Sequence, residues 1–193
     1  MRHLLNQLWP LRGGHDGRVV AGVFVGYLML TTAWWNLGLP AGFDQLGVTL
    51  LDERPGWDRG DVVALFEGLG SSGQASYRLF AWIDGLLCVA FAAALGPLLA
   101  WPLERIRPDR VWPRLPALLP WAAATLDLAE NALVLSLLAS WPTVPASLPL
   151  WGGTLTLVKM AVLAVTPLAV VLSWLGYGGL TLARRGTSAT TSP

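Results

Sequence analysis

Two carboxyl groups and an amide stand together in a stretch of the chain that is otherwise apolar. Residues 116–140 are long and apolar enough to cross a bilayer as a helix, yet Asp127, Glu130 and Asn131 lie near the middle of this stretch. An ionisable side chain at the bilayer centre costs about 2.5–3.5 kcal/mol on insertion scales. Carboxyl groups placed there at such a cost are candidates for donating or relaying protons.

The spacing of these three residues predicts that they share one helical face. They are related by offsets of three and four residues, so the polar face should turn inward while the leucines around it face lipid or neighbouring helices. Three interpretations are open at this point. The face could be a functional site, a device by which polar groups hold helices together, or a seam between copies of the chain.

Asp84 and Lys159 are two further ionisable residues within apolar stretches. At about 1.5 Å of helix rise per residue, both lie about 12–15 Å from the outer ends of their spans, as do Glu130 and Asn131. We therefore expect these groups to meet in one layer, with Asp127 about one turn deeper. Lys159 is the only lysine. We expect it to pair with Glu130, or as a second choice with Asp84.

Carboxyl groups that are desolvated and close together cannot all ionise, so one of Asp84, Asp127 and Glu130 should be protonated near neutral pH. Asp127 and Asp84 are preferred as the proton donor because Lys159 should keep Glu130 ionised. The chain also holds eleven tryptophans, whose faces stabilise cations. An acid in a dry, aromatic pocket suits carbocation chemistry. The residues expected to contact a substrate are Asn131, Lys159, Tyr77, Trp82, Trp121 and Trp34.

The composition predicts what positions these groups. With 54% hydrophobic and 13% charged residues, the chain is typical of an integral membrane protein. We predict an all-α fold in which a single domain, residues 1–185, is a four-transmembrane-helix bundle, followed by a disordered tail at 186–193. The predicted spans are 18–39, 74–100, 116–140 and 151–182.

The polar segments around these spans carry their own signals. Residues 1–17 have the spacing of a short interfacial helix. The acidic connection 40–73 predicts a short amphipathic helix, capped by Asp58 or Asp61, that either packs at the interface or covers the polar face as a lid. Arginines gather near both termini and in 101–114, which predicts a plasma-membrane protein with both termini in the cytoplasm.

Several classes of function are disfavoured. The net charge of +1 gives no basic excess for nucleic acid. His3 and His15 lie outside the spans, so we expect no haem, metal or other cofactor. Cys88 is the single cysteine and is interpreted as a core thiol. The oligomeric state is left open.

The run Asp127-Leu-Ala-Glu-Asn131, in a chain with four spans and intramembrane carboxylates, resembles the small bacterial integral-membrane terpene cyclases of drimentine-type diketopiperazine–terpene pathways. The resemblance implies a metal-independent, class II type cyclisation, started by protonation, of a prenyl chain on an indole-bearing cyclic dipeptide. The expected partners are then membrane lipid and a prenylated small molecule. The DxDD motif and the Asp-rich metal motif of soluble cyclases are absent, so the acids would form a different constellation.

Two functions of other classes compete with a cyclase. Intramembrane Asp, Glu and Lys are also what a proton-coupled carrier or channel subunit requires. A non-catalytic membrane subunit, in which the polar face only holds helices together, is the third hypothesis.

Overall fold

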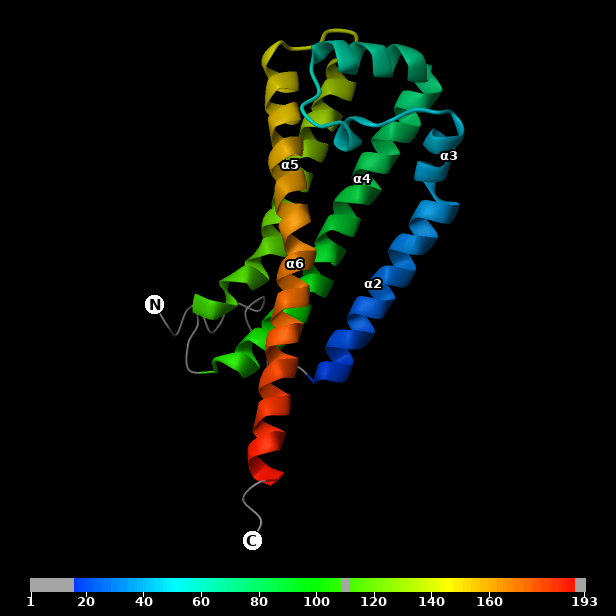
Figure 1. Cartoon of the computed structure of the whole chain (residues 1–193). Helices are drawn as coiled ribbons and strands as arrows, with labels where there is room; N and C mark the ends of the chain where they lie inside the picture. The colour runs from blue at the N-terminus through cyan, green and yellow to red at the C-terminus, as the bar shows by residue number, and fades with distance from the viewer. Residues whose placement is uncertain (1–15, 109–111, 190–193) are drawn as a thin grey trace.

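The computed structural model describes residues 16–108 and 112–189, and every regular element in these ranges is a helix. Figure 1 shows their arrangement in space. The elements in chain order are α2 (Gly17–Leu37), α3 (Leu39–Gln45), η2 (Leu51–Glu53), α4 (Arg59–Ile106), η3 (Trp112–Leu118), α5 (Leu119–Ser140) and α6 (Ser147–Ala189).

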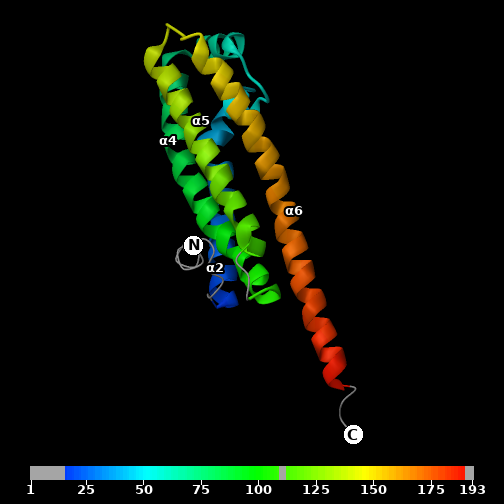
Figure 2. The same ribbon diagram turned by 90° about the vertical axis from the view of Figure 1, so that its left-hand side faces the viewer.

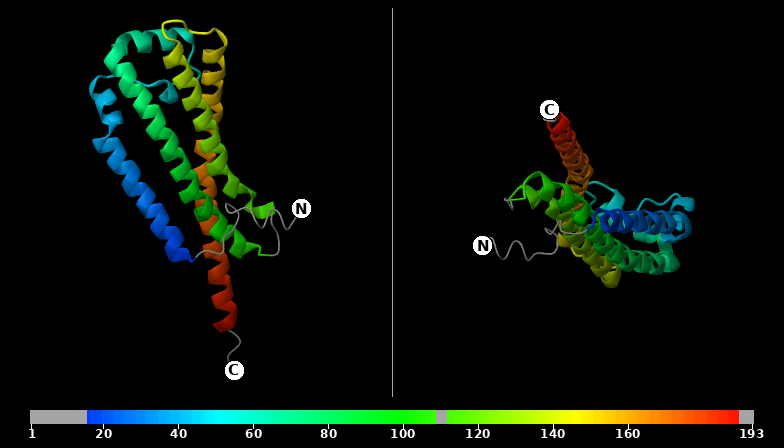
Figure 3. Two further views of the ribbon diagram at one scale, coloured as in Figure 1. Left: turned by 180° about the vertical axis from the view of Figure 1, so that it is seen from behind. Right: turned by 90° about the horizontal axis from the view of Figure 1, so that it is seen from below.

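Four of these helices, α2, α4, α5 and α6, are long and apolar enough to cross a membrane. They alternate in direction, so the start of α2 and the end of α6 lie at the same end of the bundle (Figures 1 and 2). α4, α5 and α6 pack against one another, whereas α2 packs mainly along α4. Figure 3 shows α2 set to one side of the other three. The prediction of an all-helical fold with four long apolar helices is therefore confirmed.

The two ends of the bundle differ in charge and in covering. We call one the lid end: it carries residues 46–58, the helical segment 59–69 and the connection 141–146 (Figure 1). We call the opposite end the arginine end. It carries Arg18, Arg105, Arg107, Arg184 and Arg185.

The predicted amphipathic helix is present and forms the first part of α4. Asp58 caps it: its side chain accepts from the backbone N–H groups of Gly60 (2.7 Å) and Asp61 (3.1 Å), and Asp61 accepts from the N–H of Asp58 (2.9 Å). Gly70, at φ 60° and ψ −174°, then turns the chain into the span. Only glycine adopts that conformation cheaply, so the lid helix and the span join without a loop.

The helices run further than hydropathy alone predicts. α4 continues to Ile106, and α6 begins at Ser147 because Pro149 is tolerated in a first helical turn. α6 also reaches Ala189, so residues 186–189 of the predicted disordered tail are helical. Residues 190–193 lie outside the described residues. So does the predicted interfacial helix of 1–17, apart from Asp16 and Gly17, where α2 starts.

The apolar core is concentrated at the lid end. Phe43, Phe66, Tyr77 and Phe80 are buried there, and Tyr77 contacts each of the other three rings at centroid distances of 6.1–6.4 Å. The buried core near the arginine end is small, and its members are Leu99, Ala100 and Ala117. The lid end is thus the firmly packed half, and it holds the polar layer beneath it.

Candidate functional site

The polar groups predicted to share one layer do meet there. The Lys159 ammonium of α6 lies 2.6 Å from Asp127 Oδ1 and 2.5 Å from Glu130 Oε2, both of α5. Asn131 of α5 donates its amide N–H to Asp84 Oδ2 of α4 at 2.9 Å. The predictions that residues 127, 130 and 131 share a face, and that groups from three helices converge, are confirmed.

The partners of Lys159 differ in part from the prediction. Pairing with Glu130 is confirmed, but the second-choice partner, Asp84, bonds to Asn131 instead, and the second carboxylate at Lys159 is Asp127. The physical reason is the length of the Lys159 side chain. Asp127 and Glu130 lie one turn apart on one face, and the long lysine side chain contacts both. One ammonium therefore pairs with both carboxyl groups.

Glu130 lies on the closed side of this layer. Its residue is fully buried, and it accepts a hydrogen bond from the Thr156 hydroxyl, which in turn accepts one from the indole N–H of Trp57 at 2.9 Å. Gly152 and Gly153 leave room for Trp57: a Cβ on Gly152 would come within 2.0 Å of the ring. We call these five residues the Trp57 seal. Residues 46–58, rather than the lid helix, thus reach the polar layer.

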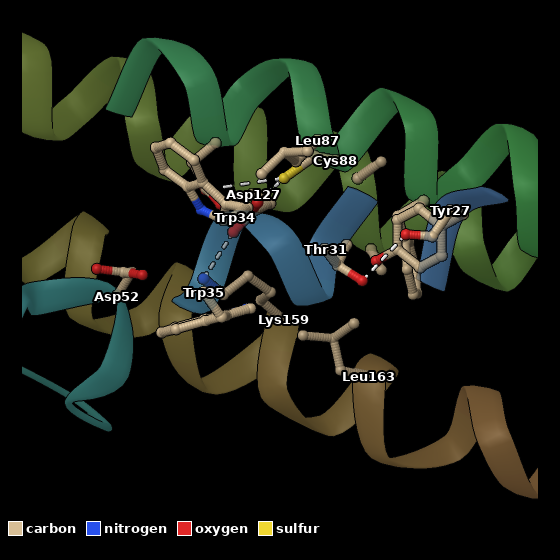
Figure 4. Close-up of a pocket in the computed structure, with 14 residues that line it drawn as sticks. Tyr27, Thr31, Trp34, Trp35, Asp52, Leu87, Cys88, Asp127, Lys159 and Leu163 are labelled. Atoms are coloured by element: carbon tan, nitrogen blue, oxygen red, sulfur yellow. Dashed lines mark hydrogen bonds and ion pairs between the residues drawn. The ribbon is translucent and has the colours of Figure 1, made fainter. Parts of the chain in front are cut away.

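A cavity of about 280 Å³ lies on the other side of the layer, and we call it the central cavity (Figure 4). Its wall takes residues from all four long helices and from η2. Most of the wall is apolar or aromatic, and three carboxyl groups and one ammonium face it. The lining residues are Tyr27, Thr31, Trp34, Trp35, Asp52, Asp84, Leu87, Cys88, Phe91, Ala123, Ala124, Asp127, Lys159 and Leu163.

The three cavity carboxyl groups have different surroundings. Asp127 is paired with Lys159, and Asp84 accepts from the Asn131 amide. Asp52 is held in η2, outside the long helices, and its buried Oδ1 has no hydrogen-bond partner among the described residues. Burial is the main cause that raises the pKa of Asp52 to about 7. Of the three, Asp52 is the group best suited to be a neutral acid.

Cys88 lies between two of these acids. Interpreted from the sequence as a core thiol, it instead lines the cavity and donates to Asp127, with Asp84 Oδ2 3.8 Å from its sulfur. The ligand atoms of Asp84, Cys88 and Asp127 lie within 4.8 Å of one another. Lys159 already supplies the positive charge beside Asp127, so we interpret this group as an ion-pair cluster. Metal independence stays a prediction.

Of the four predicted aromatic contacts, only Trp34 lines the cavity. Tyr77 is buried in the core, where its hydroxyl accepts the Leu51 N–H at 3.2 Å. Trp82 is 64% exposed because it precedes Asp84 by two residues, about 200° around the helix. Trp121 packs against Gly96, away from the cavity lining.

Other aromatic residues complete the wall. Tyr27, Trp35 and Phe91 take the places that the sequence analysis gave to Tyr77, Trp82 and Trp121. Asn131 and Glu130 stand behind the wall, and neither lines the cavity. Asn131 positions Asp84, and Glu130 belongs to the Trp57 seal.

Asp52 is the site residue that sequence reasoning missed. It sits in the acidic connection 40–73, in which only Asp58 and Asp61 were given a role, as helix caps. The signal that could have found it is the pair Leu50 and Leu51 directly before it, which are 3% and 0% exposed and draw the backbone into the bundle.

Comparisons with protein-family models, with curated proteins and with solved structures found no match to this chain. The proposals below therefore rest on the central cavity and on the groups that face it.

Proposed function

We propose that this chain is a membrane-embedded enzyme that cyclises a prenyl chain by protonating one of its double bonds. The observation that carries the proposal is the central cavity: among the described residues Asp52 and Asp84 form no ion pair, and aromatic side chains form much of the surrounding wall. An acid is needed to start such a reaction, and π-faces stabilise the cation without attacking it.

The reaction balances with carboxyl groups alone. A carboxylic acid gives its proton to an alkene carbon, the C–H bond forms as the π bond breaks, and a carbocation and a carboxylate result. Neighbouring double bonds then attack the cation and form ring C–C bonds. A carboxylate finally removes a proton from the last cation, which leaves an alkene. The product is an isomer of the substrate, and no metal or other cofactor enters.

The volume and lining of the cavity support an apolar substrate. Its volume of about 280 Å³ is near the lower limit of about 300 Å³ for small-molecule pockets. This space suits a prenyl chain, whereas the indole-bearing cyclic dipeptide implied by the resemblance would remain at its mouth. α2 and α6 both contribute to the wall, and α2 has only Val20 buried. We propose that substrate enters from the lipid beside α2.

We also propose that the four helices cross the plasma membrane with the arginine end in the cytoplasm, because basic residues are retained on that side. Cysteines introduced at Asp58 and at Arg107, in a Cys88→Ala background, test this orientation. A reagent that cannot cross membranes should label the first in intact cells and the second only after permeabilisation. Labelling of both from one side would overturn it.

A proton-coupled carrier is the second candidate. One observation favours it: Asp52, Asp84, Asp127 and Lys159 line one cavity, and Lys159 also pairs with Glu130 behind its wall. Proteoliposomes that contain the chain and a pH-sensitive dye distinguish the two. Acidification driven by an imposed gradient, without formation of any cyclic product, would favour the carrier. A non-catalytic subunit would show neither activity.

Prenylated indole cyclic dipeptides incubated with membranes that contain the chain test the cyclase. We expect an isomer with a new retention time that gains one deuterium when the reaction is run in D₂O, and EDTA should leave its rate unchanged. Asp84→Asn should lower the rate by about 10²–10⁴-fold while the protein stays folded. The matched control is Glu67→Gln, on the exposed face of the lid helix.

The alternative is that the carboxyl groups are structural. If Asp52→Asn, Asp84→Asn, Asp127→Asn and Glu130→Gln all stayed folded and fully active on a confirmed substrate, the acid mechanism would be wrong.

A further inference from the structure

Asp52 is fixed in position although it comes from a connection. Leu51 is fully buried, and its backbone N–H donates to the Tyr77 hydroxyl at 3.2 Å. Five residues after Asp52, Trp57 is inserted beside Gly152 and bonded to Thr156. Two hydrogen bonds, one to Tyr77 of α4 and one to Thr156 of α6, therefore hold η2 beside the polar layer. Figure 4 shows Asp52 at one end of the cavity, reached by no dashed line.

The groups around Asp52 make its proton available. Asp84 and Tyr77 of α4, Glu130 of α5 and Lys159 of α6 act on it electrostatically. Lys159 is the only cation among them, and its ammonium already contacts Asp127 and Glu130. Burial, aided by the two carboxylates Asp84 and Glu130, outweighs Lys159 and raises the pKa of Asp52 to about 7.

Asp52 and Asp84, the two cavity carboxyl groups outside the Lys159 ion pairs, differ in how readily they can donate a proton. Asp84 Oδ2 accepts a hydrogen bond from the Asn131 amide, which holds this carboxyl group in place as an acceptor. Asp52 Oδ1 is buried, faces the same cavity and has no such donor among the described residues. Among the described residues, no protein acceptor competes with a substrate double bond for a proton on Asp52 Oδ1.

We propose that Asp52 is the acid that starts the cyclisation and that Asp84 is the base that ends it. The assignment rests on the proposed function and replaces the expectation that the starting acid lies within a span. Asp52 protonates the alkene at the lid end of the cavity. The final cation loses its proton to the Asp84 carboxylate deeper in the wall.

The cycle closes without a net loss of protons. After one turnover Asp52 is ionised and Asp84 is protonated. Asp52 regains a proton from water at the lid end, where the next residue, Glu53, is exposed. Asp84 releases its proton when the product leaves and water enters the cavity.

Activity measurements test the roles. Asp52→Asn keeps the size of the side chain and removes the proton, so the rate should fall by at least about 10²-fold. Asp52→Glu should recover part of it. Because protonated Asp52 is the active form, the wild-type rate should fall as pH rises above about 7. Glu53→Gln, the neighbouring exposed acid, should keep the rate and the pH profile of the wild type.

Thermal unfolding in detergent gives a readout that does not need a substrate. The folded chain retains a proton on Asp52 that the unfolded chain releases between the usual pKa of 3.8 and about 7. Asp52 therefore costs stability at pH 8 and not at pH 4. Asp52→Asn should unfold several degrees above the wild type at pH 8, and the difference should shrink toward pH 4. Glu53→Gln should follow the wild type.

The outcomes separate the two proposals. If the wild type makes no cyclic product but Asp52→Asn is stabilised at pH 8, the buried acid is real and the cyclase is wrong. If the wild type is active and Asp52→Asn is equally active with the same pH profile, Asp52 is not the starting acid. If Asp52→Asn and the wild type unfolded at equal temperatures at both pH values, the inference that Asp52 carries a buried carboxyl group without a compensating partner would be wrong.

Discussion

The two sides of the polar layer use the same kind of side chain in opposite ways. Behind the cavity wall, Glu130 is fully buried, paired with Lys159 and bonded through Thr156 to Trp57. Facing the cavity, Asp52 has an unpartnered buried oxygen. A carboxylate that is paired with a cation and accepts a hydrogen bond from a neighbouring hydroxyl stabilises a single arrangement of helices. An unsatisfied one costs stability, and such a cost is expected where a protein retains a group for chemistry.

This contrast indicates that the residues behind the cavity wall have a structural role and that those facing the cavity have a reactive one. The Trp57 seal ties residues 46–58 to α6 and holds η2 in place, so the closed side supports the geometry of the open side. Substitutions behind the wall should therefore lower stability first. Substitutions that face the cavity should lower activity in a protein that still folds.

The largest effect is expected at Lys159. Lys159→Met leaves Asp127 and Glu130 without their cation in a buried site, which should destabilise the folded state by about 3–5 kcal/mol. Adding Glu130→Gln to this variant should restore part of the loss. A double-mutant cycle from thermal unfolding in detergent measures the coupling.

Asp84→Asn provides the matched control for that cycle, since Asp84 bonds to Asn131 and forms no ion pair with Lys159 among the described residues. Its effect should add to that of Lys159→Met more simply than the effect of Glu130→Gln does. Full additivity with Glu130→Gln would show that the 2.5 Å pair contributes no coupling and that the closed side is not held by charge.

The next effect is expected at Gly152 in the Trp57 seal. Gly152→Ala places a methyl group 2.0 Å from the Trp57 ring, and overpacking of this kind costs about 1–3 kcal/mol. Gly178→Ala is the control in the same helix, because a Cβ there meets nothing within 4 Å. The control should unfold at or above the wild-type temperature. If both variants behaved alike, the insertion of Trp57 beside α6 would be wrong.

The helices could be predicted from the sequence because their signals are local. Apolar runs set the four spans, and Asp58 with Asp61 marked the start of the lid helix. Helix ends were harder to predict, since backbone hydrogen bonding continues beyond the point where hydropathy falls. This is why α6 extends past Arg185 to Ala189, while α4 joins the lid helix to the long apolar helix across a kink at Gly70.

The site could be predicted only where helical geometry determines it. Offsets and depth brought Asp127, Glu130, Asn131, Asp84 and Lys159 together. Asp52 is placed by the path of an irregular connection between two anchors, and no periodicity describes such a path. The aromatic residues of the cavity wall were predicted from their depth along each helix, without regard to the side of the helix that they face.

The smallest effect is expected from a substitution in the aromatic wall, where Trp34 lines the central cavity and Trp82 was only predicted to do so. Trp34 lines the cavity and Trp82 is 64% exposed, so only the first can lie against a cation in the site. A cation–π contact contributes about 0.5–2 kcal/mol, so Trp34→Leu should slow the reaction by about 2–30-fold, more where the cation is most desolvated. Trp82→Leu should leave the rate within about twofold of the wild type. Both variants keep a large apolar side chain, and their unfolding temperatures show whether packing has changed. A rate that fell with Trp82→Leu and not with Trp34→Leu would place the reacting chain on the outer face of α4, where no carboxyl group of the central cavity could reach it.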